Sequence, residues 1–198
     1  MAKPHIKGLP PYLDMRVREA VARIVLNSKA QPTLEVELKG AGWRVRASSP
    51  SGTSAGSHEV QAWPRAGTVE EAVRAAAGVL EREIFPEIVG KDLEPAEVDE
   101  IIENADGTPR LERVGGNAAL AVSTASLKAF AWDQGIMYSE AVAEAFGFRP
   151  GPVKPLENFI GGGAHGGASD IQEYLVAVET EDMRESVLTL AWAYRETG

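Results

Sequence analysis

The sequence predicts an α+β protein, because strand-like and helix-like patterns follow one another in blocks. Apolar and polar side chains alternate near the N-terminus, apolar positions take helical spacing in the middle, and two strand-like runs and a helix close the chain. A complete α/β domain would instead alternate single strands with helices. We therefore expect a small antiparallel sheet followed by helices, and then a short ββα extension.

The predicted sheet occupies the first fifty residues. A flexible N-terminal arm is expected over residues 1–20, because its first twelve residues hold three prolines and two lysines. An apolar run spans residues 21–26, and alternating segments follow at 34–39 and 43–47 with glycines between them. Alternation with a period of two around a glycine turn is typical of a β-hairpin.

Helices are expected in the middle of the chain. The first begins at Thr68, which forms a capping box with Glu71, and ends at Pro86. The others are predicted at 95–104, 117–132 and 139–146. We expect Asn117 to cap the 117–132 helix, which is apolar nearly all round and should therefore be buried.

The last part of the chain, residues 149–198, is expected to form a separate ββα unit behind the linker 149–152. Its strands are predicted at 153–160 and 171–178, and its helix begins at a Thr180 cap. Residues 21–148 form the larger domain.

Composition and charge exclude several classes of protein. The net charge of −9 argues against a nucleic-acid surface, and the absence of cysteine excludes a disulfide framework and a Cys-ligated zinc site. No run approaches the ~20 apolar residues that span a bilayer, and the N-terminus lacks the apolar core of a signal peptide. We expect a cytoplasmic protein with neither nucleic acid nor membrane as a partner.

Two loops of small residues are candidate binding sites. The loop 51–56, SGTSAG, offers hydroxyl oxygens suited to phosphate or Mg²⁺, although an ordinary surface loop has the same composition. His165 lies among glycines in a loop that could bring its imidazole onto a ligand or could be a simple hairpin connection. The formal GxGxxG match at 161–166 precedes a strand-like segment, so it lacks the helix that dinucleotide binding requires.

Glu173 lies in the last predicted strand, and its side chain could have either of two roles. Buried beside apolar neighbours, its carboxylate would serve as a general acid. On the solvent-facing side of a half-exposed strand, it would be an ordinary surface residue.

Segments along most of the chain match known motifs in the same order. They are NSKAQPTLEVE from 27, PSGTSAGSHE from 50, GKD from 90, DGT from 106, GGNAALAVS from 115, GGGAHGG from 161 and QEYLV from 172. Together they resemble enolase, the Mg²⁺-dependent phosphopyruvate hydratase (a lyase) of glycolysis. The resemblance implies that residues 21–148 form an enolase N-terminal capping domain, and that 149–198 form the first ββα of its TIM-like barrel.

The resemblance also implies roles for individual residues. Ser54 matches the serine that binds the catalytic Mg²⁺ and is the one family metal ligand retained. His165 matches the loop histidine that approaches the substrate phosphate, and Glu173 matches the glutamate that assists departure of the hydroxyl as water. The implied substrate-binding residues are His165, Gln172, Ser51 and Gly52. The implied ligand is therefore a small phosphorylated molecule, with Mg²⁺ as cofactor.

The family's metal-binding carboxylates and catalytic lysine lie on later barrel strands that have no counterpart in these 198 residues. The sequence also departs from the family at Lys29 and Ala30, where enolases have Arg-Gly. One hypothesis is an enolase-related protein that is not catalytic alone and acts as a partner-dependent or dimeric binding module. The alternative is the N-terminal subunit or a fragment of a split enolase that converts 2-phosphoglycerate to phosphoenolpyruvate.

A partner is expected in either case. An incomplete barrel leaves an open strand edge, and the last helix would expose Leu188 or Trp192 on its flank. The partner would be a second copy of the chain or a barrel-bearing protein.

Overall fold

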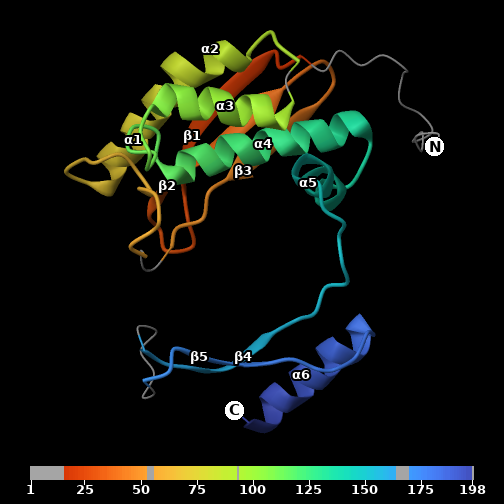
Figure 1. The fold of residues 1–198 in the computed structure, drawn as a ribbon. Coiled ribbons are helices and arrows are strands. Elements are labelled where there is room, and N and C mark those ends of the chain that lie inside the picture. Colours follow the sequence, from red (N-terminus) through yellow and green to blue (C-terminus); the bar gives the residue numbers. More distant parts are fainter. Residues whose placement is uncertain (1–15, 53–55, 93, 164–169, 198) are drawn as a thin grey trace. The chain divides into compact units, whose positions relative to one another are not determined.

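Figure 1 shows a computed structural model of the chain, which describes residues 16–52, 56–92, 94–163 and 170–197. The chain divides into two compact units, unit 1 (residues 1–148) and unit 2 (residues 149–198). Among the described residues, no helix is both long and apolar enough to cross a membrane.

Unit 1 contains the predicted antiparallel sheet. Its strands are β1 (Glu19–Leu26), β2 (Pro32–Lys39) and β3 (Arg44–Ser48), in the order β1-β2-β3. The register places Val36 of β2 opposite Ala22 of β1 and Ala47 of β3, so these side chains share the face that packs on the core. Val17 is buried and β1 begins at Glu19, so the last residues of segment 1–20 belong to the sheet rather than to an arm.

The helices of unit 1 lie on one side of this sheet (Figure 1). They are α1 (Val69–Val79), a π-helical turn η1 (Leu80–Ile84), α2 (Phe85–Ile88), α3 (Pro95–Asp106), α4 (Gly116–Gln134) and α5 (Tyr138–Phe146). Helix α4 packs on β2 and β3, and α3 packs against α4. As predicted, α4 is largely buried, because alanines such as Ala118 and Ala121 let its backbone approach the sheet closely.

The helix boundaries confirm one predicted cap and correct two predicted ends. Thr68 and Glu71 form the capping box, with Glu71 N donating to Thr68 Oγ1 at 3.2 Å and Thr68 N donating to Glu71 Oε2 at 3.0 Å. Pro86 does not end the first helix, because it lies in the first turn of α2, which follows the π-helical turn η1 directly. Asn117 is not a cap, because α4 begins one residue earlier and Gly115 precedes it.

Unit 2 is a hairpin with one helix. It comprises β4 (Glu157–Gly161), β5 (Glu173–Val176) and α6 (Met183–Thr197), and the two strands are antiparallel. Both strands are shorter than predicted; proline at 152 and 155 removes backbone donors from the start of the first. Asp182 rather than Thr180 caps α6, because its Oδ1 accepts from the backbone N of Arg184 at 2.8 Å.

A buried carboxylate lies on the face of the sheet opposite the helices. The Glu37 side chain is 1% exposed, and it accepts hydrogen bonds from Arg23 Nη2 at 2.9 Å and from Arg46 Nε. Lys39 Nζ lies 3.1 Å from Glu37 Oε1. The hydrogen bond from Arg23, with those from Arg46 and Lys39, outweighs burial and lowers the pKa of Glu37 to about 2. Glu37 faces away from the helices, and basic side chains from both neighbouring strands, Arg23 and Arg46, cover it.

Replacing Glu37 with glutamine is expected to flatten the acid side of the stability profile. A carboxylate with a lowered folded pKa contributes stability above its unfolded pKa of 4.5, and this contribution is lost as the pH falls toward about 2. Between about pH 5 and pH 2, the free energy of unfolding, measured with urea, should therefore fall less steeply with falling pH for Glu37→Gln than for wild type. The two slopes should differ by up to the equivalent of one proton. The exposed Glu81→Gln variant is the control, and equal slopes for wild type and Glu37→Gln would contradict this account of Glu37.

Candidate functional site

The first part of the candidate site lies where the turn between β1 and β2 meets the end of β3. Asn27 organises the turn, because its Oδ1 accepts from the backbone N of Lys29 at 2.8 Å and of Gln31 at 3.0 Å. The same side chain donates from Nδ2 to Ser51 Oγ at 2.8 Å. Asn27 therefore fixes the position of Ser51 relative to the sheet.

This turn includes a backbone conformation that favours glycine. Ala30 has φ +56°, in the left-handed region that costs energy for a residue with a Cβ. The sequence showed Ala30 at a position where the motif it resembles has glycine, and the structure gives the conformational reason for glycine there.

A hollow of about 350 Å³ opens beside Ser51. Its polar lining comes from Asn27, Ser28, Lys29, Thr33, Ser48, Ser49 and Ser51. Thr33 Oγ1 donates to the carbonyl oxygen of Ser49 at 2.9 Å, which fixes the backbone just before Ser51. Hydroxyl groups and one lysine ammonium are donors that suit an anion such as a phosphate.

Gly52 and Gly56 flank the rest of the loop. Gly52 is exposed, and Ser54 lies outside the described residues, so its implied role as a metal ligand stays a prediction. At the far end, Gly56 N donates to Glu59 Oε1 at 3.0 Å and Glu59 N donates to Gly56 O at 3.2 Å. The chain thus leaves the loop through a local turn.

The second part of the candidate site belongs to unit 2. Glu173 begins β5 opposite Gly161, and the carbonyl oxygen of Gln172 accepts from Gly162 N at 2.8 Å. Glu173 is exposed, so the burial that a general acid requires is not supplied by unit 2 itself. His165 lies outside the described residues.

The described candidate site residues belong to two different units. Ser51 and Gly52 lie in unit 1, and Gln172 and Glu173 lie in unit 2. Within the described ranges, no group of three or more Asp, Glu or His side chains is placed to hold a metal ion. The hydroxyls and Lys29 around the hollow fit an anion better than a cation.

The comparison with known families decides the relationship. The model of the family described as "Enolase, N-terminal domain" matches residues 17–141. The chain belongs to the enolase family. The matched segment lies within unit 1 and includes both Asn27 and the loop 51–56.

Curated enolases align with most of this chain. It is 39% identical over 170 residues to the enolase of Pyrobaculum aerophilum, an alignment that covers 81% of this chain and 39% of that protein. It is 36% identical over 186 residues to enolase 2 of Methanospirillum hungatei, covering 88% of this chain and 42% of that protein. The enolase of Methanothermobacter thermautotrophicus is 36% identical over 191 residues, with coverage of 92% and 42%. The chain thus spans about two fifths of the length of these relatives.

This enolase-family domain has a buried carboxylate to which sequence reasoning gave no role. Asp106, at the end of α3, is 1% exposed and accepts from the backbone N of Thr108 at 3.1 Å, Arg113 at 2.9 Å and Val114 at 2.7 Å. Burial alone would raise the pKa of Asp106, but hydrogen bonds from Thr108 and from the backbone at Val114 and Arg113 hold it below its ordinary value. The DGT motif was the available signal, because an Asp-Gly pair after a helix is typical of a carboxylate that binds its own turn.

Proposed function

We propose that these 198 residues supply the N-terminal side of an enolase active site and are not catalytic on their own. The completed site would dehydrate 2-phosphoglycerate to phosphoenolpyruvate, with a C-terminal barrel provided by the same polypeptide or by another. Membership of the enolase family and the coverage of about two fifths of the curated relatives support this proposal.

One observation carries the proposal: unit 2 leaves large apolar side chains uncovered on both strands and on its helix. They are Ile160, Tyr174, Leu175, Val176, Val187, Leu188 and Trp192, each at least 40% exposed. Full burial of an exposed large apolar side chain is worth about 1.5–3 kcal/mol, and about half of each of these side chains is still exposed, so covering this surface favours association. The two-stranded sheet also has open edges, and one helix packed on β4 gives it only a small core of its own.

Further barrel strands are the covering that best explains this surface. A barrel of eight strands would extend the sheet, shield the flank of α6 and bury Glu173 beside apolar neighbours. Glu173 would then assist the departing hydroxyl. On unit 1, the hydroxyls and Lys29 around the hollow offer donors that suit a phosphate. The base that removes the α-proton and the carboxylates that hold Mg²⁺ would come from the barrel.

A dimeric binding module without enolase chemistry is the second candidate. The same exposed surface on unit 2 favours it, because two copies could bury that surface against each other. The two candidates differ in whether adding a barrel produces activity.

The test measures dehydration of 2-phosphoglycerate by ultraviolet absorbance of the enol product. The samples are this chain alone, a barrel polypeptide made from the remainder of the Pyrobaculum aerophilum enolase, and the two mixed or fused. We expect no turnover from the chain alone and turnover in the combined sample, and Glu173→Gln should reduce that turnover by about 10²–10⁴-fold.

Glu179→Gln, an exposed glutamate beyond β5, is the matched control and should leave turnover unchanged. Turnover by the chain alone, equal to that of the combined sample, would refute the claim that it needs a barrel. An inactive combined sample together with a dimeric native mass would favour the binding module.

A further inference from the structure

The loop that carries Ser51 and Gly52 is held differently at its two ends. At the start, Asn27 and Thr33 bind it to the sheet through side chains that are themselves fixed in turns and strands. At the end, Gly56 and Glu59 bind mainly each other, and both are exposed. A local, exposed turn of this kind is weak, so a second support is needed to fix the end of the loop.

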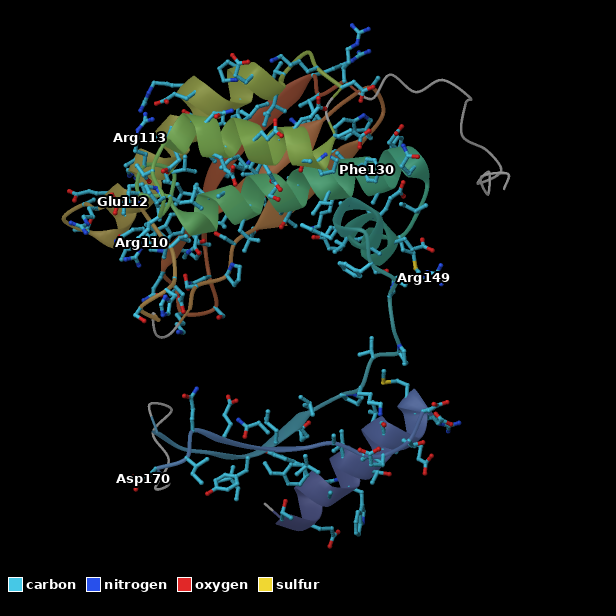
Figure 2. All side chains as sticks on the ribbon, in the orientation of Figure 1. Arg110, Glu112, Arg113, Phe130, Arg149 and Asp170 are labelled. Carbon is cyan, nitrogen blue, oxygen red and sulfur yellow. The ribbon has the colours of Figure 1, made fainter. Side chains whose placement is uncertain are left out.

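Arg110 supplies that support from a distant part of the sequence. Its Nη2 donates to the carbonyl oxygen of Glu59, and its own carbonyl oxygen accepts from Gln61 N at 3.0 Å. Figure 2 shows Arg110 and Arg113 on the side of unit 1 where the segment after β3 passes the connection between α3 and α4. The side chain of Arg110 therefore links residues 56–60 to that connection.

The connection that carries Arg110 is itself firmly held. The Asp106 carboxylate binds its backbone from inside at Thr108, Arg113 and Val114. From outside, Arg113 Nη2 binds Glu83 Oε1 at 2.7 Å and Oε2 at 2.9 Å. Because this connection is fixed on both sides, the Arg110 side chain that it carries can hold the carbonyl oxygen of Glu59 in a defined position.

The segment just beyond Glu59 is fixed without the Arg110 side chain. Gly116 N donates to Gln61 O at 2.7 Å, and Asn117 N donates to Ala62 O at 3.1 Å, so residues 61–62 are bound to the start of α4. Loss of the Arg110 side chain should therefore loosen residues 56–60 and leave the rest of unit 1 unchanged.

We propose that Arg110 is a positioning residue for the end of the candidate substrate loop, acting through the carbonyl oxygen of Glu59. The inference rests on the proposed function of that loop. Gly56 ends the loop that Ser51 and Gly52 begin, so the contact between Arg110 and Glu59 fixes where the chain returns from that loop. Misplacement of binding groups by about 1 Å is enough to reduce turnover by up to 10²-fold.

The first arm of the experiment uses the 198-residue chain alone and amide hydrogen exchange followed by NMR. Arg110→Ala should accelerate exchange at Glu59 and its neighbours by about 10-fold or more, while amides of α4 and the sheet and the melting temperature stay unchanged. Arg65→Ala, an exposed arginine after the same segment, should change nothing. Arg110→Lys should restore part of the protection, because an ammonium can still donate to the Glu59 carbonyl.

The second arm uses the chain combined with the barrel. Arg110→Ala should reduce kcat/KM for 2-phosphoglycerate by about 10-fold, mainly through KM, at an unchanged melting temperature. Wild-type exchange at residues 56–60 in Arg110→Ala, or wild-type kcat/KM in an active combined sample, would overturn the positioning role. An inactive wild-type combination would overturn the proposed function instead, and the exchange result would then decide the role of Arg110 by itself.

Discussion

Replacing Asp106 with alanine is expected to lower the free energy of unfolding of unit 1 by about 3–5 kcal/mol, because the backbone N–H groups of Thr108, Arg113 and Val114 lose a buried acceptor. The side chain is 1% exposed, so water cannot replace it without opening the structure. Because these hydrogen bonds hold the pKa of Asp106 below 3.8, its contribution is present above that pH and is lost as the pH falls through the lower folded value.

The measurement is urea unfolding followed by tryptophan fluorescence in a Trp192→Phe background, where the three remaining tryptophans, at 43, 63 and 132, all lie in unit 1. Glu100→Gln, an exposed carboxylate on the same helix, is the control and should change stability by less than about 0.5 kcal/mol. A loss for Asp106→Ala no larger than that of the control would show that the carboxylate does not hold the 107–114 connection.

Replacing Gly115 with alanine is expected to cost about 3 kcal/mol. Its φ of +82° with ψ 138° lies outside the left-handed helical region and is strained for any residue with a Cβ, which contributes about 1–3 kcal/mol. The new Cβ would also lie 2.8 Å from both Ala62 O and Trp63 Cα, so the backbone of segment 62–63 must move, at a further cost of about 1–3 kcal/mol.

Gly42→Ala separates these two causes. Gly42 has a similar φ of +85°, but no atom lies within 4 Å of the added Cβ. The difference in unfolding free energy between Gly115→Ala and Gly42→Ala, measured in the same Trp192→Phe background, therefore reports the overlap together with the strain that the ψ of 138° adds at Gly115. Equal losses would mean that the start of α4 does not support segment 62–63 as tightly as the structure indicates.

Local sequence patterns predicted the elements of unit 1 well, because their causes are local. The alternation around Val36 and the capping box at Thr68 each depend on residues a few positions apart. Besides the end of the arm and the strand lengths of unit 2, the predictions that were wrong, at Pro86, Asn117 and Thr180, concern helix ends. There a π-helical turn, the close approach of Gly115 to the preceding loop, or the neighbouring Asp182 decides the boundary, and none of these follows from propensity.

The candidate site was less predictable for the same reason. Resemblance pointed to Ser51, Gly52, Gln172 and Glu173, and the roles of Ser54 and His165 stay predictions because these residues lie outside the described ranges. The supporting contacts were missed because they join distant parts of the chain. Asn27 binds Ser51 across 24 residues, and Arg110 binds Glu59 across 51.

The central claim is that unit 2 is an incomplete part of a barrel, and amide hydrogen exchange of its strands tests this most directly. In the chain alone, amides of β4, β5 and α6 should exchange far faster than those of β2 and α4, because their apolar faces are uncovered. Addition of the barrel polypeptide should slow exchange in unit 2 by about 10²-fold or more and leave the core of unit 1 unchanged. Protection of unit 2 equal to that of unit 1 in the chain alone, or unchanged after the barrel is added, would contradict the account.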